Sequence, residues 1–255
     1  MISPIAIGYT SQPPTIANLN PFYKNGCFFA FHASSGTNTV VFDVGNRGNF
    51  AAVSNATRTL QAKGYGLTQP TGNANCWNRT DIVASTLSSG DYTLIFLTKP
   101  GVVTNTEVLF AGANTANAWF GKASSLWSFN GGGGGPTVTG GWQVVGVRKA
   151  GAVFEIFADG VFATATTAAF GSASTTIGAF GNGDTTFNWT GNTPCGAAWT
   201  YAMDRSQIIN LTKNIWQLFA MPRKQYPFAP TTASSFLAAW ALGSNASVIG
   251  SGIHA

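Results

Sequence analysis

The chain has 255 residues, of which 45% are hydrophobic and only 8% are charged. About a quarter of the residues in a typical globular protein are charged, so this composition excludes a chain kept disordered by its charge and disfavours a bundle of solvated helices. The 13 Lys and Arg residues give a net charge of +5 but are dispersed, whereas nucleic-acid-binding proteins gather basic residues in a stripe. We therefore expect no nucleic-acid partner.

The two ends of the chain differ from its middle. Residues 1–21 contain four prolines and show no hydrophobic periodicity, which predicts an extended N-terminal arm because proline disfavours regular strand ladders. Residues 229–255 are poor in charge and rich in Ala, Ser and Gly, so we predict a C-terminal arm, with one domain over 22–228. The residues expected to contact neighbouring subunits through these arms are Pro13, Pro14, Phe236, Trp240 and Leu242.

Short apolar or alternating runs predict strands through the first half of the domain. These strands are expected at 27–31, 40–43, 91–100, 107–111, 118–121 and 125–129. Residues 51–81 are polar and irregular, and we expect at most two weak strands there. The glycine run 131–135 lacks the Lys-Ser/Thr pair of a phosphate-binding loop, so it is interpreted as a flexible connection.

Residues 142–163 predict a three-stranded meander. The runs 143–148 and 152–157 are rich in strand-forming residues, and Asp159-Gly160 is a typical sequence for a two-residue type I′ hairpin. Such a meander must bury one face, so it belongs to a larger sheet. Further strands are expected at 176–180, 187–191 and 197–201.

One helix is predicted near the end of the domain. Asp204 is a candidate N-cap, with Ile208, Leu211 and Ile215 at helical spacing, and the helix is expected to end near Asn214. Many short strands without β-α-β alternation predict an all-β fold. The expected architecture is a two-sheet antiparallel jelly-roll sandwich with one short C-terminal helix and extended terminal arms.

The order of these elements resembles the laminin-G-like jelly rolls of the concanavalin A-like lectin/glucanase superfamily. The resemblance is carried by 30–36, 41–49, 92–96, 142–148, 157–161, 177–191 and 203–211. Residues 214–220, Asn-Ile-Trp-Gln-Leu-Phe-Ala, resemble the N-P-W-Q-L-F-A-P ending of jelly-roll proteins from tailed bacteriophages, with Ile215 in place of the proline. This second resemblance implies a virion protein.

The acidic residues do not match the chemistry of the glucanases in that superfamily. Those enzymes use a strand of the form E-x-D-x-x-E, which is missing from this sequence. The nearest acidic pair is Glu155 and Asp159, which would lie about 13 Å apart in an extended strand, beyond the roughly 5 to 9.5 Å needed for glycoside hydrolysis. His32 has no accompanying nucleophile motif. We therefore expect no enzymatic activity.

Metal sites have weak support in the sequence. Cys27, Cys76 and Cys195 are widely separated, which favours buried free thiols over zinc ligands or disulfides. We expect no cofactor, with calcium as the alternative that the resemblance implies. The candidate calcium ligands are Asp43 with Asn46 and Asn49, and Asp184 with Asn182.

Two functions follow from this sequence. We predict a non-enzymatic virion structural protein, a capsid decoration or a tail or fibre component, which forms homo-oligomers and binds the major capsid or tail protein through its arms. The alternative is a lectin-like module on the virion that binds a host-surface glycan or receptor. Sugar binding uses aromatic platforms beside amides, and the candidate contacts are Trp77, Asn78, Asn117 and Trp119. The sequence shows neither a signal peptide nor a membrane span, so we expect synthesis in the host cytoplasm and localisation in the virion.

Overall fold

The computed structural model describes residues 18–45, 48–53, 56–61, 64–68, 76–87, 90–112, 119–130, 134–166, 170, 174–177 and 189–220. All of them lie in the unit Met1–Met221, and none lies in the unit Pro222–Ala255. The five predicted assembly residues Pro13, Pro14, Phe236, Trp240 and Leu242 lie outside the described residues, as does the predicted arm 229–255. The predicted domain limits therefore remain predictions.

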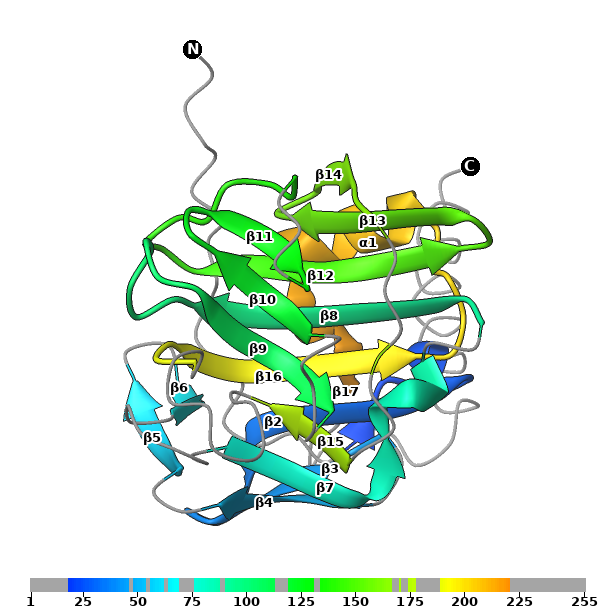
Figure 1. Cartoon of the computed structure of the whole chain (residues 1–255). Coiled ribbons are helices and arrows are strands. Elements are labelled where there is room, and N and C mark those ends of the chain that lie inside the picture. Colours follow the sequence, from blue (N-terminus) through cyan, green and yellow to red (C-terminus); the bar gives the residue numbers. More distant parts are fainter. Residues whose placement is uncertain are drawn as a thin grey trace, which may run out of the picture. The chain divides into compact units, whose positions relative to one another are not determined.

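The described residues form a two-layer antiparallel β-sandwich (Figure 1). The front layer contains, in spatial order, β11 (Leu126–Phe129), β10 (Trp119–Ala123), β9 (Glu107–Gly112), β15 (Ser174–Ile177), β7 (Cys76–Val83) and β4 (Asn49–Val53). Strand β3 (Val40–Asp43) joins it to the rear layer, which contains β2 (Cys27–Gly36), β16 (Asn192–Trp199), β8 (Tyr92–Lys99), β12 (Gln143–Ala150), β13 (Val153–Ala158) and β14 (Val161–Thr164). The predicted all-β, two-sheet antiparallel sandwich is confirmed.

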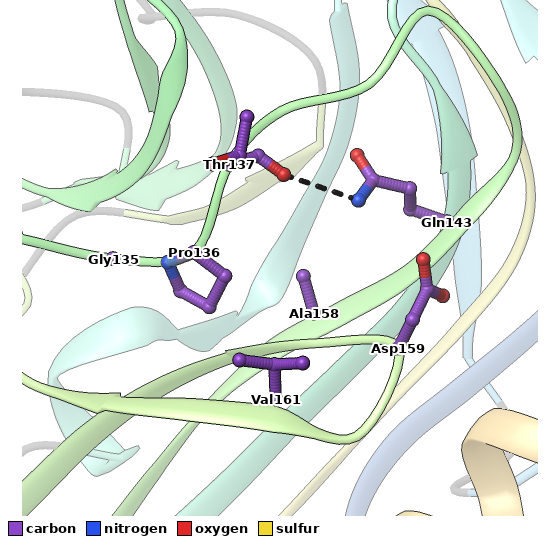
Figure 2. A pocket seen from close by; sticks show the side chains of 7 residues that line it. All are labelled: Gly135, Pro136, Thr137, Gln143, Ala158, Asp159 and Val161. Carbon is purple, nitrogen blue, oxygen red and sulfur yellow. Dashed lines mark hydrogen bonds between the residues drawn. The ribbon is translucent and has the colours of Figure 1, made fainter. Parts of the chain in front are cut away.

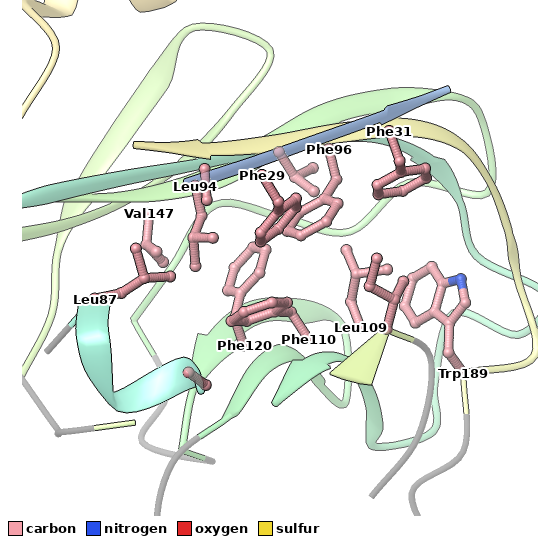
Figure 3. Close-up of a cluster of buried hydrophobic side chains, with 14 of the residues drawn as sticks. Phe29, Phe31, Leu87, Leu94, Phe96, Leu109, Phe110, Phe120, Val147 and Trp189 are labelled. Atoms are coloured by element: carbon pink, nitrogen blue, oxygen red, sulfur yellow. The ribbon is translucent and has the colours of Figure 1, made fainter. Parts of the chain in front are cut away.

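The core between the two layers is built mainly from phenylalanine rings (Figure 3). Phe29 from β2 stacks on Phe110 from β9 with ring centroids 5.7 Å apart, and Phe96 from β8 lies 6.4 Å from Phe120 on β10. All four rings are fully buried. Gly196 on β16 leaves the space that the Phe96 ring fills, since a Cβ there would lie 2.2 Å from a ring carbon. Burial of these rings is the main force that holds the two layers together.

A second apolar cluster covers the outer face of the rear layer. Helix α1 (Arg205–Lys213) presents Ile208 and Leu211, both fully buried, to a cluster that also contains Ile95 and Ala197 of the sheet. The 3-10 helix η3 (Ile215–Leu218) continues this cover. The central rear strands β8 and β16 are therefore buried on both faces. The predicted helix is confirmed, with Asp204 as its N-cap and Asn214 as its C-cap.

The predicted meander 142–163 is confirmed as β12, β13 and β14. Asp159 and Gly160 both have left-handed backbone, with φ of 50° and 83°, as a type I′ hairpin requires. Gly151 in the preceding turn has φ of 57°. The strand-forming runs and the turn residues between them were sufficient to locate these strands because both signals are local.

Residues 51–81 and 187–191 differ from the prediction. The first segment is mostly strand: it contains the rest of β4, the hairpin of β5 (Thr57–Gln61) with β6 (Gly64–Thr68), and the start of β7. Strand β7 is ordered by its pairing with β15, nearly a hundred residues away, which local sequence cannot reveal. In the second segment, Trp189–Gly191 lies outside any strand, and the Trp189 indole is buried in the core.

The start and the end of the described chain pair with each other. Asn18–Leu19 forms β1, which is antiparallel to β17 (Phe219–Ala220), with Asn18 opposite Ala220. The short 3-10 helix η1 (Pro21–Tyr23) follows, and another, η2 (Ala84–Leu87), lies after β7. Strands β1 and β17 form a two-stranded sheet separate from the strands of the sandwich, and Leu19 packs in the second apolar cluster.

Candidate functional site

A pocket of about 360 Å³ lies at one end of the sandwich, beside the β13–β14 hairpin. Its lining residues are Gly135, Pro136, Thr137, Gln143, Ala158, Asp159 and Val161. Figure 2 shows the Gln143 amide and the Asp159 carboxylate along one side, with Pro136 and Val161 across from them. We call this the rim pocket. Its volume is at the lower end of the range for small-molecule sites, about 300 to 1,000 Å³.

Gln143 fixes the polar wall of the rim pocket. Its Oε1 accepts hydrogen bonds from Trp127 Nε1 at 3.2 Å and from Thr139 N at 2.8 Å, and its Nε2 donates to the Thr137 carbonyl at 3.2 Å. Side-chain amides carry two N–H donors, and none of these contacts uses the second one. The amide therefore holds the loop 135–139 against β12 and retains a donor.

Asp159 supplies the negative charge of the rim pocket. It is half-buried in the β13–β14 turn, and its Oδ1 accepts a hydrogen bond from Val144 N at 2.8 Å while its own N–H donates to the Val144 carbonyl at 2.8 Å. The carboxylate is therefore held in place from two sides. The sequence indicated Asp159 only as a turn residue, because its loop partner 135–137 is brought to it by the fold.

The structure places the predicted sugar-contact residues differently from the sequence-based expectation. Trp77 is fully buried in the core beside Ile177, so it offers no exposed face on which a sugar ring could stack. Trp119 and Asn78 lie on one outward row of the front layer, linked through Ala111 and Thr176. Three strand spacings separate the two, about 14 Å. Trp119 is 7% exposed, and Asn117 lies outside the described residues.

His32 and two of the three cysteines, Cys76 and Cys195, are buried, and Cys27 is half-buried. His32 packs between the rings of Trp216 and Phe219, at centroid distances of 5.2 and 5.0 Å, and burial lowers its pKa to about 3. Burial also raises the pKa of the thiol of Cys195, its cross-strand neighbour. A neutral imidazole beside a protonated thiol does not activate a nucleophile. The three cysteines are free, as the sequence predicts.

The candidate calcium ligand Asp43 is engaged by protein groups. Its Oδ2 accepts a hydrogen bond from Arg79, and its Oδ1 accepts from Ala30 N at 2.8 Å and from Gly45 N at 2.7 Å. Asn46, Asn182 and Asp184 lie outside the described residues. Within the described ranges, no group of three or more His, Cys, Asp or Glu residues is arranged to hold a metal ion. The Arg79–Asp43 pair, both members buried, therefore fastens β7 to β3.

Glu155, the other member of the acidic pair in the sequence, forms ion pairs with Arg148 and Arg205. Burial alone would raise the pKa of this carboxyl, but the hydrogen bonds and charges of the two arginines lower it instead. Glu155 thus joins the first turn of α1 to β12. The nearest acidic neighbour of Asp159 in the sequence is therefore engaged in holding the helix.

A buried charge pair at the same end of the sandwich was not foreseen. Lys122 Nζ lies 3.6 Å from Glu107 Oε1, and Thr190 Oγ1 donates to the same oxygen at 2.8 Å. Burial lowers the pKa of Lys122 despite the nearby carboxylate. Lys122 and Glu107 are cross-strand neighbours on β10 and β9. The two residues become neighbours only through the pairing of β10 with β9, so the local sequence around each of them does not indicate the charge pair.

Within the part of the chain that the structure describes, no helix is long and apolar enough to cross a membrane. The single α-helix among those residues has nine residues, whereas a span requires about 20.

No protein-family model and no curated protein matches the chain. Among solved structures it is similar to a Trypanosoma rangeli sialidase in complex with sialic acid, with 14% identity and a TM-score of 0.56 over 78% of this chain and 35% of that one. It is also similar to the binding domain of Paraclostridial Mosquitocidal Protein 1, with 9% identity and a TM-score of 0.55 over 74% and 52% of the two chains. The third match is domain 4 of AbnA, a GH43 extracellular arabinanase from Geobacillus stearothermophilus in complex with arabinotriose, with 16% identity and a TM-score of 0.52 over 73% and 98%.

These comparisons correct one expectation from the sequence. The prediction that the chain is not an enzyme is wrong, because the structures similar to it include sialidases and a domain of a GH43 arabinanase. The fold therefore does not exclude enzymatic activity. The chain spans about a third of the sialidase and nearly the whole of the arabinanase domain. At these identities the likeness shows the fold alone: the chain is an all-β sandwich of a kind found as one domain within larger carbohydrate-active and toxin proteins.

Proposed function

We propose that this chain is a carbohydrate-recognition module of the concanavalin A-like type, with the rim pocket as its sugar-binding site. The observation that carries the proposal is the chemistry of the pocket wall. The Asp159 carboxylate accepts hydrogen bonds, the Gln143 amide retains a donor, and the Thr137 hydroxyl does both. Sugar hydroxyls each donate and accept, so this combination matches a pair of neighbouring hydroxyls.

The opposite wall supports the same proposal. Pro136, Ala158 and Val161 give it an apolar surface on which the C–H face of a sugar ring can rest. The domain of the arabinanase that binds arabinotriose is covered over almost its full length by this chain, which adds support from the fold. Aromatic stacking on Trp77, which the sequence suggested, has no part in this proposal because that indole is buried.

The test of this proposal places a bulky side chain at the exposed wall of the rim pocket, so that it blocks the space for a sugar. Val161 is 62% exposed on the edge strand β14, so Val161→Trp places an indole over the pocket at little cost to folding. Val153→Trp is the matched control, since Val153 is 47% exposed on β13 and does not line the pocket. A glycan array identifies the saccharide, and calorimetry then measures its affinity. We expect wild type and Val153→Trp to bind the same saccharide with similar affinity and Val161→Trp to bind it at least tenfold more weakly. Equal binding by all three proteins would contradict the proposal.

We propose assembly into a phage virion as a second candidate function. It is favoured by the pairing of Asn18 with Ala220, which places the attachment points of residues 1–17 and 221–255 side by side. Two extensions that begin at one place could together bind a major capsid or tail protein or a second copy of the chain. Light scattering on the full chain and on residues 18–220 tests this. We expect the full chain to be an oligomer and residues 18–220 to be a folded monomer. If both proteins are monomers, the proposed assembly is refuted.

A further inference from the structure

A short segment at the end of the described chain covers His32 on β2. Strands β1 and β17 pair only with each other among the described strands, and η3 leads directly into β17. This segment presents Trp216 and Phe219 to the ring of His32, at centroid distances of 5.2 and 5.0 Å. We call residues 215–220 the clasp, because they cover His32 and also contain the pairing partner of β1.

His32 does not take up a proton readily while the clasp is closed. Its Nδ1 accepts a hydrogen bond from Ser34 N at 3.1 Å, and Ser34 Oγ lies 2.6 Å from the same nitrogen. A backbone N–H cannot turn away, and an imidazolium carries an N–H on both ring nitrogens. Protonation would therefore set two N–H groups against each other. Burial acts in the same direction and lowers the pKa of His32 to about 3.

Three neighbouring strands contribute a titratable or charged group near His32. On β16 its cross-strand neighbour is Cys195, whose thiol stays protonated because burial raises its pKa. On β5, Arg58 Nη1 donates to the carbonyls of the two residues that follow His32, at 3.0 and 3.3 Å, which brings a positive charge close to the ring. On β3, Asp43 is paired with Arg79. The clasp itself contains no titratable residue, so the proton that acts on it is the one that His32 takes up.

The clasp is the side of this site that can open. Strand β2 lies between β3 and β16 and could leave the ring only by breaking both pairings. The clasp is held more lightly: Asn20 donates from its N to the Leu218 carbonyl and from its Nδ2 to the Gln217 carbonyl. Trp216 Nε1 is buried without a hydrogen-bond partner among the described residues, and an unpaired buried donor favours the hydrated, open state. Local opening begins in weakly held segments of this kind.

We propose that the clasp opens in acid: proton uptake by His32 releases residues 215–220 and β1 while the two layers of the sandwich stay folded. In the open state the imidazole meets water and binds a proton near its ordinary pKa of about 6.5. Opening therefore becomes more frequent as the pH falls below 6.5, by about 25-fold between pH 7 and pH 5. Because β1 and β17 then separate, acid uncouples the attachment points of residues 1–17 and 221–255.

Hydrogen–deuterium exchange of the full chain from pH 7 to pH 5, followed by mass spectrometry, tests this. After correction for the intrinsic pH dependence of exchange, we expect the amides of Asn20 and of residues 216–220 to open about 25-fold more often at pH 5. The amides of β8 should open equally often at both pH values. His32→Gln should remove the pH dependence of the clasp. His254→Gln is the matched control, since it removes the other imidazole of the chain, and it should behave as wild type.

Every other outcome overturns the inference. Clasp amides that open equally often at pH 7 and pH 5 in wild type would show that proton uptake by His32 does not open the clasp. Amides of β8 that open in parallel with the clasp would show that acid unfolds the whole sandwich. A pH dependence that persists in His32→Gln would place its cause in another group. The first two comparisons use wild type alone, so they decide the matter even if His32→Gln does not fold.

Discussion

The indole Nε1 of Trp127 donates a hydrogen bond of 3.2 Å to Oε1 of Gln143, which ties the polar wall of the rim pocket to the aromatic core. Trp127 itself packs between Phe120 and Trp189, at centroid distances of 5.9 Å to each. The position of the pocket wall is therefore set by the packing between the two layers.

Replacing Gln143 by leucine should destabilise the fold and loosen the pocket. Gln143→Leu leaves Trp127 Nε1 and Thr139 N without their acceptor, and a buried donor left unpaired costs about 1 to 3 kcal/mol. Urea unfolding followed by circular dichroism measures the loss. Thr104→Leu at an exposed position is the control and should change the free energy of unfolding little. A Gln143→Leu protein as stable as wild type would show that this amide does not hold the loop.

Trp77 should behave as a core residue. Trp77→Ala removes a fully buried indole between the layers, and such a truncation costs about 3 to 5 kcal/mol. Trp142→Ala is the control, since Trp142 is only half-buried at the edge of the second cluster and its loss should cost less. Chemical denaturation compares the two. A mild effect at Trp77 together with loss of sugar binding would instead restore the sequence-based interpretation of Trp77 as a contact residue.

His32 should make stability depend on pH between about 5 and 6.5. The unfolded chain takes up a proton on this imidazole near pH 6.5, whereas the folded protein does so only near pH 3. The free energy of unfolding therefore falls as the pH drops below 6.5, by up to about 1.4 kcal/mol per pH unit. Protonation is opposed locally because His32 Nδ1 already accepts a hydrogen bond from Ser34 N at 3.1 Å.

The control for His32 is His32→Gln, which removes the titrating group. Its free energy of unfolding should change less than that of wild type over pH 5 to 6.5, a range above the ordinary pKa values of Asp and Glu. Parallel pH profiles for the two proteins would show that His32 is accessible to protons in the folded state.

Strand β1 should contribute more to the stability of the fold than its length of two residues suggests. Removing residues 1–21 deletes buried Leu19 and the hydrogen bonds of Asn20, whose N–H donates to the Leu218 carbonyl at 2.8 Å and whose Nδ2 donates to the Gln217 carbonyl at 2.9 Å. The expected loss is about 3 kcal/mol. Removing only residues 1–17 is the matched control, and we expect it to lower the melting temperature less because it keeps Leu19 and Asn20. Equal melting temperatures for both truncations would exclude a structural role for β1.

The elements whose signals are local could be located from the residues alone. Asp159-Gly160 located the β13–β14 hairpin because a type I′ turn restricts the residues at both central positions. Asp204, Ile208 and Leu211 located α1 because capping and helical spacing act within a few residues. The many short strands predicted a sandwich, and the structure confirms it.

The side chains that face one another could be identified only in the folded protein. It buried Trp77, joined Arg79 to Asp43, and brought the loop that carries Thr137 to within reach of Gln143. Side chains alternate between the two faces of a strand, so a shift of one residue in pairing exchanges the exposed and the buried sets. That register is fixed by contacts between strands far apart in the chain, as between β7 and β15. For the same physical reason, the rim pocket could be found only after the fold had brought its walls together.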